Sequence, residues 1–267
     1  MIRETTLFGV RDLEALAIQR IHAFEAEALS MSDDGYYVAF SGGKDSIVLL
    51  DLFRKAGVKH TSHFNLTTVD PPELLKFVLD NYRDVERVPP RINMFDLIRK
   101  NRFPPTRLIR YCCMEFKERG GKGRFVATGI RWAESSRRSK RRMTEPCYRN
   151  KNTRYLHPII DWSDTDIWEY IKTNDMPYCS LYDEGFTRIG CVGCPMTSVE
   201  QRRIEFARWP RFEASYRKAF DDAANSQKSL ERPEGQRWQS GQEMWDWWMG
   251  GEPSNRNDDY QLMLFDD

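Results

Sequence analysis

Hydrophobic positions in the N-terminal part of the chain alternate between the helical and the strand period. Apolar residues spaced for one helical face between Leu13 and Leu29 predict a helix. The apolar run at residues 36 to 40 predicts a buried strand, residues 47 to 56 predict a helix, and residues 59 to 65 predict a second strand. A strand, a glycine-rich turn, a helix and a strand in this order form a parallel βαβ unit, whose crossover is almost always right-handed.

The alternation continues more weakly along the middle of the chain. Residues 83 to 88 and 125 to 128 predict two further strands, and residues 95 to 100 predict a helix. Ser163 and Asp166 have the spacing of a capping pair at the start of another helix. We therefore expect an α/β fold with a parallel sheet.

The last quarter of the chain has a different character. It is helical in pattern and strongly charged, with a break at Pro210. Four tryptophans follow, Trp238, Trp245, Trp247 and Trp248. We interpret them as a small hydrophobic cluster or, alternatively, as a platform on which nucleic-acid bases stack. We expect an α/β domain over residues 1–200 and a small helical, tryptophan-rich extension over residues 201–267.

A glycine-rich turn joins the first predicted strand to the helix that follows it, with the sequence Ser41-Gly42-Gly43-Lys44-Asp45-Ser46. In such a turn, backbone N–H groups and the positive end of the helix converge on an anion. Lys44 would pair with phosphate, and Ser41 and Ser46 would donate hydroxyl hydrogen bonds. Asp45 would hold Mg²⁺ or orient the loop. The turn is not a Walker A motif, because GxxxxGK[ST] is absent.

This hexapeptide is similar to the pyrophosphate-binding loop of the PP-loop ATP pyrophosphatases. Within them, residues 30 to 200 resemble the phosphoadenosine phosphosulfate (PAPS) reductase family. The resemblance implies a Rossmann-like adenine nucleotide α-hydrolase fold, with a mainly parallel five-stranded sheet and helices on both faces. It also implies that ATP binds at the carboxyl ends of the strands and is cleaved to AMP and pyrophosphate.

A second segment extends the resemblance to the side of the nucleotide. Gly129-Ile130-Arg131, with Arg138 further on, is similar to the family's second nucleotide-contacting segment. Because Arg131 follows a predicted strand, we expect it to reach a phosphate, and we expect Gly129 and Arg138 to contact the nucleotide. Lys44, Asp45 and Arg131 are then the expected catalytic residues. The alternative for both arginines is a solvated surface position.

The composition is typical of a globular protein, and the charge distribution indicates a candidate binding surface at one segment only. The formal net charge of the 267 residues is +1, so the global charge gives no case for nucleic acid. Five of six consecutive residues are basic in Arg137-Arg138-Ser139-Lys140-Arg141-Arg142. We interpret this segment as a lid over phosphates or as a contact to a nucleic-acid substrate, with a solvated loop as the alternative.

The N-terminal residues lack the apolar core of a signal peptide, and no run approaches the roughly 18 apolar residues of a membrane span. We therefore expect a cytoplasmic protein without a membrane partner. It would act as a homo-oligomer or as a subunit of a larger complex. In that compartment its six cysteines are not expected to form structural disulfides.

Four of the cysteines occur as two pairs, an adjacent pair and a CxxC, which indicates metal or redox chemistry. Thiolates suit iron–sulfur clusters or zinc. The order of the pairs resembles the assimilatory reductases that carry a [4Fe-4S] cluster, which implies as its ligands Cys112, Cys113, Cys191 and Cys194. Zinc in the same thiolates, ligation by three cysteines with Cys147 exchanged for one of the adjacent pair, and no metal at all are the alternatives. We interpret Cys179 as a buried structural cysteine.

The chain differs from those reductases at one position that matters for the reaction. They use a nucleophilic cysteine near the C-terminus, and no cysteine follows Cys194 here. We therefore favour an enzyme that adenylates an acceptor and supports iron–sulfur-dependent sulfur transfer, as in the similar DNA phosphorothioation and tRNA thiolation proteins. Its partner would be a sulfur donor such as a cysteine desulfurase.

Two other functions stay open. The first is a reductase of adenylyl sulfate or of its 3′-phosphorylated form, in which Cys147 or Cys179 supplies the thiol. The second is a non-catalytic nucleotide-binding subunit of a modification or defence complex.

Overall fold

The computed structural model of the chain describes residues 3–6, 9–148, 150–228 and 238–250. Its elements cluster into two compact units. The first unit comprises Met1–Arg91 and Cys113–Cys191, and the second comprises Ile92–Cys112 and Val192–Asp267. Among the described helices, none combines the length and the apolar character that crossing a bilayer requires.

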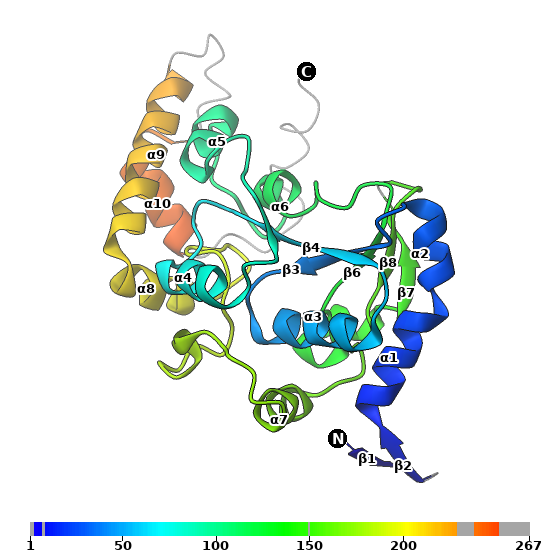
Figure 1. Cartoon of the computed structure of the whole chain (residues 1–267). Helices are drawn as coiled ribbons and strands as arrows, with labels where there is room; N and C mark the ends of the chain where they lie inside the picture. Colours follow the sequence, from blue (N-terminus) through cyan, green and yellow to red (C-terminus); the bar gives the residue numbers. More distant parts are fainter. Residues whose placement is uncertain (1–2, 7–8, 149, 229–237, 251–267) are drawn as a thin grey trace. The chain divides into compact units, whose positions relative to one another are not determined.

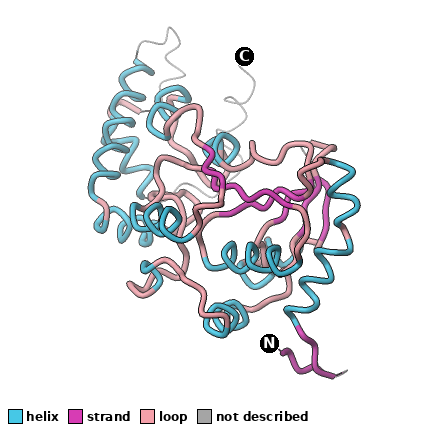
Figure 2. The backbone as a smooth tube through the Cα atoms, in the orientation of Figure 1, coloured by secondary structure: helices cyan, strands magenta, loops and turns pink. Residues whose placement is uncertain are grey.

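The first unit is the α/β part of the chain (Figures 1 and 2). Its elements, in chain order, are β1 (Arg3–Thr6), β2 (Gly9–Asp12), α1 (Leu13–Ala23), α2 (Glu25–Met31), β3 (Tyr36–Phe40), α3 (Lys44–Ala56), β4 (His60–Asn65), α4 (Pro72–Asn81), β5 (Glu86–Val88), β6 (Phe125–Ala127), η1 (Trp132–Glu134), η2 (Arg138–Lys140), β7 (Thr144–Pro146), β8 (Arg154–Leu156), α7 (Asp164–Thr173) and η3 (Ser180–Tyr182). Here η denotes a 3₁₀ helix. Helix α6 (Tyr111–Phe116) begins in the second unit and ends in the first.

The described strands of the main sheet number six, in the order β5-β4-β3-β6-β8-β7. The first five run parallel to their neighbours, and β7 pairs antiparallel with β8 at one edge. The prediction of a mainly parallel α/β sheet is therefore confirmed, and β7 adds an antiparallel sixth strand to five parallel ones. β7 includes Pro146, which an edge strand tolerates because its missing N–H need not serve a second neighbour.

The central strand β3 carries the core of this unit, because side chains of consecutive residues point to opposite faces of the sheet. On one face, the Tyr36 ring lies 5.1 Å from the Phe53 ring of α3, and its hydroxyl donates a hydrogen bond of 2.7 Å to the Ile21 carbonyl of α1. Next along the strand, Tyr37 stacks on His63 of β4 with 4.1 Å between ring centroids. The apolar run of β3 thus packs on both sides, as in a buried parallel strand.

The helix expected between Leu13 and Leu29 is divided into α1 and α2. Phe24 separates them, with φ −115° and ψ 7°, outside the helical region. Its ring contacts the Phe125 ring of β6 edge-on at 5.8 Å. The apolar spacing continues across the break, so the sequence pattern alone does not locate it.

The second unit is helical, and its elements are α5 (Met94–Asn101), α8 (Val199–Arg208), α9 (Pro210–Lys228) and α10 (Gly241–Gly250). Pro210 begins α9, where a missing N–H costs nothing, so the predicted break is found. Trp238, Trp245 and Trp248 are buried within this unit, and Trp248 donates an indole hydrogen bond of 2.8 Å to the Pro105 carbonyl. Buried rings are not available to stack on bases. The unit also includes residues 92–112, which the expected division after residue 200 assigned to the first domain.

Candidate functional site

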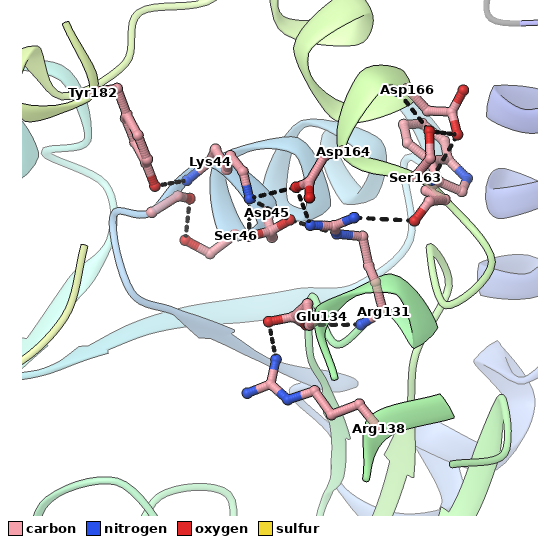
Figure 3. A network of polar contacts seen from close by, with 12 residues as sticks. Lys44, Asp45, Ser46, Arg131, Glu134, Arg138, Ser163, Asp164, Asp166 and Tyr182 are labelled. Carbon is pink, nitrogen blue, oxygen red and sulfur yellow. Dashed lines mark hydrogen bonds and ion pairs between the residues drawn. The ribbon is translucent and has the colours of Figure 1, made fainter. Parts of the chain in front are cut away.

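The glycine-rich turn joins the end of β3 to the start of α3 (Figure 3). Gly42 has φ +72°, a left-handed conformation that side chains disfavour. A Cβ at this position would lie 2.7 Å from Leu74 Cδ1 and 2.8 Å from Val78 Cγ2, both on α4. Glycine is therefore required here both by the backbone conformation and by the close approach of α4.

The two serines of the loop bond to the loop itself. The Ser46 hydroxyl donates to the Gly43 carbonyl at 2.9 Å and accepts from the Ser41 backbone N–H at 3.1 Å. The Ser41 hydroxyl donates to Ser46 Oγ at 3.1 Å. These bonds hold the turn in one shape before any ligand is present. The hydroxyl donation to a ligand that we expected for Ser46 would require it to give up its bond to Gly43.

Four charged side chains converge beside the first turn of α3 (Figure 3). Lys44 Nζ lies 3.2 Å from Asp45 Oδ2 and 3.1 Å from Asp164 Oδ1. Arg131 Nε lies 2.6 Å from Asp45 Oδ1, and Arg131 Nη2 lies 2.8 Å from Asp164 Oδ1. The structure thus brings together the three expected catalytic residues, and it adds Asp164, which the sequence analysis did not select.

Arg131 is buried, with 1% of its side chain exposed, so a solvated position is wrong for this arginine. Its third interaction is a hydrogen bond of 3.1 Å from Nη1 to the Trp162 carbonyl. Burial by itself would lower the pKa of Arg131, but the carboxylates of Asp45 and Asp164 outweigh it and raise the pKa. A buried charge needs such partners, so Arg131 connects the loop to the start of α7.

Asp164 is the first residue of α7, and Ser163 and Asp166 form the capping box at the start of this helix. An acidic residue in the first turn of a helix is common for reasons of helix stability alone, and this concealed its role in the sequence. Its side chain is 64% exposed. Desolvation raises the pKa of Asp164, but hydrogen bonds from Lys44 and Arg131 outweigh it and lower the pKa, so the carboxylate is ionised at neutral pH.

Tyr182 of η3 also contacts the loop. Its hydroxyl oxygen accepts a hydrogen bond of 2.9 Å from the Lys44 backbone N–H, one of the groups expected to face a phosphate. Burial raises the pKa of Tyr182, so the phenol is neutral at physiological pH. The ring is fixed by an edge-on contact with Trp168 at 5.1 Å. No spacing or motif in the sequence pointed to this residue.

Gly129 and Arg138, both expected to contact the nucleotide, have different places. A Cβ on Gly129 would lie 2.9 Å from the Asp45 carbonyl oxygen, so glycine allows the segment after β6 to approach α3 closely. Arg138 pairs with Glu134, whose other oxygen accepts the Arg131 backbone N–H at 2.9 Å. Arg138 therefore supports the segment that carries Arg131, and among the described residues its ion pair is with Glu134 and not with the loop.

The basic segment is partly neutralised by its neighbours. Arg138 pairs with Glu134, and Arg141 pairs with Glu145. The other three basic side chains of this segment, Arg137, Lys140 and Arg142, are exposed and form no ion pair with the described residues. Three outward-facing cations thus follow closely on the segment that carries Arg131.

The expected metal ligands are divided between the units. Cys113 and Cys191 belong to the first, and Cys112 and Cys194 to the second. Among the described residues, no three His, Cys, Asp or Glu side chains form a group that could hold a metal ion. The thiols suit a cluster chemically, but each unit by itself holds only two of the four, so we derive no reaction step from a cluster. The ligand set stays a prediction.

The CxxC turn has a supported backbone in the second unit. Gly193 has φ +72°, and its N–H donates a hydrogen bond of 2.8 Å to Glu205 Oε2. The Val192 carbonyl accepts a hydrogen bond of 3.0 Å from the Tyr216 hydroxyl. A Cβ on Gly193 would lie 2.7 Å from Phe206 Cζ. Side chains of α8 and α9 therefore fix the shape of this turn.

The sequence model of the phosphoadenosine phosphosulfate reductase domain matches residues 35–197, which is well over half of the chain. The chain belongs to the PAPS reductase family. The matched range includes the glycine-rich loop, Arg131 and both cysteine pairs. The family and the fold class inferred from the resemblance are therefore confirmed.

The chain matches individual relatives over only part of their length. An uncharacterised protein of Methanocaldococcus jannaschii is 33% identical over 196 residues, 66% of this chain and 40% of that protein. A phosphoadenosine 5′-phosphosulfate reductase of Xylella fastidiosa is 41% identical over 87 residues, 32% of this chain and 35% of that protein. The chain spans less than half the length of these curated relatives.

The solved structures to which the chain is similar include two enzymes from Candida species. The phosphoadenylyl-sulfate reductase of Candida auris, in a phosphate complex, has a TM-score of 0.49 at 18% identity and covers 70% of this chain and 96% of that one. The FMN adenylyltransferase of Candida glabrata has a TM-score of 0.47 at 17% identity and covers 68% of this chain and 61% of that one.

Proposed function

We propose that this chain binds ATP at residues 41–46 and cleaves it between the α- and β-phosphates, transferring AMP to an acceptor. One observation carries the proposal. Lys44 Nζ and Arg131 Nη2 lie 3.1 Å and 2.8 Å from the same oxygen, Asp164 Oδ1, beside the N-terminus of α3. An ammonium and a guanidinium at hydrogen-bond distance from one point suit a phosphate oxygen.

The proposed reaction makes use of this placement. A nucleophilic atom of the acceptor attacks the α-phosphorus, the bond from that phosphorus to the bridging oxygen breaks, and pyrophosphate leaves. Lys44 and Arg131 stabilise the negative charge that builds up on the departing pyrophosphate. The acceptor then carries AMP, which a sulfur nucleophile from a donor such as a cysteine desulfurase displaces.

Mg²⁺, when bound, would neutralise further phosphate charge. Asp45 is the residue expected to hold it, but both of its oxygens face cations. Oδ1 lies 2.6 Å from Arg131 Nε, and Oδ2 lies 3.2 Å from Lys44 Nζ. We therefore assign Asp45 the other expected role, that of orienting the loop and Arg131.

Pyrophosphate release tests the proposal. Purified protein with ATP, Mg²⁺ and candidate acceptors should release pyrophosphate, and Lys44→Ala should lose this activity. Lys76→Ala, which removes an exposed lysine from α4, is the matched control and should keep it. Products of ADP and phosphate would contradict α–β cleavage. ATP binding that depends on Lys44, without turnover in any condition, would instead favour a non-catalytic nucleotide-binding subunit.

A second candidate function is reduction of a sulfonucleotide, which the family match favours. A thiolate would attack the sulfate sulfur, the S–O bond to the phosphate would break, and the nucleotide would leave. A dithiol reductant would then release sulfite as its disulfide forms. Cys179 is 1% exposed, and burial raises the pKa of its thiol, so it is a poor nucleophile. The half-buried Cys147 is the better placed of the two.

Sulfite assays distinguish this candidate from ATP cleavage. With adenylyl sulfate or its 3′-phosphorylated form and a dithiol, a reductase should release sulfite. Cys147→Ser should abolish the release, and Cys179→Ser should not. Absence of sulfite from both sulfonucleotides would eliminate this function.

For the acceptor, we propose a nucleic acid that contacts Arg137, Lys140 and Arg142, because these exposed cations have no ion-pair partner among the described residues. Fluorescence anisotropy with short DNA and RNA strands measures this contact. The triple substitution to glutamine should weaken binding and flatten its salt dependence. Lys76→Gln should leave the affinity unchanged.

The four paired cysteines are proposed as cluster ligands on the strength of the resemblance. Anaerobic purification followed by iron, acid-labile sulfide and zinc analysis tests them. Iron and sulfide that Cys113→Ser or Cys194→Ser removes would support the ligand set. Stoichiometric zinc without iron would replace the cluster by a zinc site.

A further inference from the structure

Three hydrogen-bond donors of the proposed phosphate site already bond to protein oxygens. The Lys44 backbone N–H donates to Tyr182 Oη at 2.9 Å. Lys44 Nζ and Arg131 Nη2 both face Asp164 Oδ1, at 3.1 Å and 2.8 Å. Neither oxygen belongs to the glycine-rich loop, because Asp164 begins α7 and Tyr182 ends η3.

The chemistry of these contacts is that of anion binding. A helix N-terminal N–H, an ammonium and a guanidinium are the groups that hold phosphate oxygens in proteins. A carboxylate oxygen shared by the ammonium and the guanidinium occupies a position that suits a ligand oxygen. The tyrosine hydroxyl occupies the position in front of the N–H (Figure 3).

The two carboxylates that face Lys44 and Arg131 differ in how easily a ligand can displace them. Asp45 is the neighbour of Lys44 on α3, is 24% exposed, and lies 2.6 Å from the buried Arg131. Asp164 is 64% exposed, so its carboxylate can turn into solvent, where water replaces its contacts with Lys44 and Arg131. Asp164 is therefore the anion that gives way when a ligand enters.

We propose that Asp164 and Tyr182 are internal competitors for the phosphate site, so that a ligand binds by displacing the Asp164 carboxylate and the Tyr182 hydroxyl. This inference rests on the proposed anion-binding function of the loop. It makes these two residues determinants of ligand affinity. The loop with its internal partners is electrically balanced, so only a ligand with more negative charge than one carboxylate replaces Asp164 readily. A pyrophosphate group meets that requirement.

The test measures the Kd of inorganic pyrophosphate by titration calorimetry in a magnesium-free buffer with a chelator. Asp164→Asn removes the charge and keeps the shape of the side chain. It should tighten pyrophosphate binding about five- to tenfold, because one negative charge a few ångströms from the ligand is removed. The gain should shrink as sodium chloride is raised, because salt screens the charge.

Asp84→Asn is the matched control. Asp84 is 63% exposed and pairs with Arg54 at 2.6 Å, near the other end of α3. Its substitution removes the same charge at the same exposure and should change the pyrophosphate Kd less than twofold. Tyr182→Phe keeps the ring on Trp168 but loses the hydroxyl, and should tighten binding about threefold.

The possible outcomes separate this inference from the function on which it rests. If the wild type binds pyrophosphate, Lys44→Ala does not, and Asp164→Asn binds no more tightly than the wild type, the competitor role is overturned and the phosphate site stands. If the wild type does not bind pyrophosphate, both are overturned. Weaker binding by both Asp164→Asn and Tyr182→Phe would mean that these residues assist the ligand, which also overturns the competitor role. Thermal melts of each variant check that it is folded.

Discussion

Two glycine turns of this chain share a backbone conformation and differ in their surroundings. Gly42 in the first unit and Gly193 in the second both have φ +72°, and a Cβ on either would lie within 3 Å of packed side chains. Around Gly42, charged groups from three segments converge on one point beside α3. Around Gly193, Glu205 and Tyr216 bond to the backbone of the turn.

The difference separates two ways of preparing a functional loop. The first turn has both a fixed backbone and an assembled set of charged side chains, which are the elements of a binding site. The second has a fixed backbone, but a group of three or more His, Cys, Asp or Glu side chains that could hold a metal is not found among the described residues. A fixed loop shape is therefore not by itself evidence of a formed site, and the two turns should respond differently to substitution.

The largest effect is expected from breaking the buried ion pairs of the first turn. Arg131→Met should lower the free energy of unfolding by about 3–5 kcal/mol, because Asp45 loses its closest partner and the loop loses its tie to α7. Arg54→Met is the control, since Arg54 also lies 2.6 Å from its aspartate partner but is 40% exposed. It should cost less than about 1 kcal/mol. Urea denaturation measures the free energy of unfolding of both variants. Equal losses of stability would show that the ion pairs of Arg131 contribute no more than an ordinary surface ion pair.

Substitution of the two glycines sharpens the comparison directly. Gly42→Ala and Gly193→Ala should each destabilise the protein by about 2–4 kcal/mol, because the backbone conformation is strained and the new methyl group meets packed side chains. Gly57→Ala is the control, since Gly57 has φ +66° with no atom within 4 Å of the added carbon. It should cost about 1–2 kcal/mol. Gly42→Ala should also weaken pyrophosphate binding by calorimetry, and Gly193→Ala should not.

A smaller effect is expected from the carboxylate that holds the second turn. Glu205→Ala should lower the free energy of unfolding by about 1–3 kcal/mol, because the Gly193 N–H loses its acceptor in a buried position. Glu205→Gln keeps an acceptor oxygen and should lower the free energy of unfolding by less. Both variants should bind pyrophosphate like the wild type. A large loss of pyrophosphate binding in either would show that the two turns are coupled.

The smallest effect concerns pH and the first unit alone. His157 is buried, and burial lowers its pKa, although the neighbouring Glu145 opposes the shift. Below the unfolded-state pKa of about 6.5, the unfolded chain binds more protons than the folded one, so stability should fall as pH falls. Urea denaturation at pH 7.5 and 5.5 should show this loss. His157→Gln should reduce it more than substitution of the half-exposed His22. An unchanged pH dependence would contradict a neutral buried His157.

Much of the first unit was predictable because its signals are local. The apolar run of β3, the glycine-rich turn and the helical pattern of α3 adjoin one another in the chain, and each is found where expected. The break at Pro210 is likewise a property of one residue. The break at Phe24 was not predicted, because the apolar spacing of α1 and α2 runs through it.

The sequence by itself determined the βαβ unit, the place of the glycine-rich loop and the need for glycine in it, because these depend on neighbouring residues. Only the tertiary structure decided what faces the loop. Arg131 is 86 residues from Asp45 and 33 from Asp164, and Tyr182 is 138 residues from Lys44. Contacts over such separations depend on how strands and helices pack, and no local pattern encodes them. For that reason the arginine expected at a phosphate is buried between two aspartates, and two of the oxygens that face Lys44 and Arg131 come from residues that the sequence did not single out.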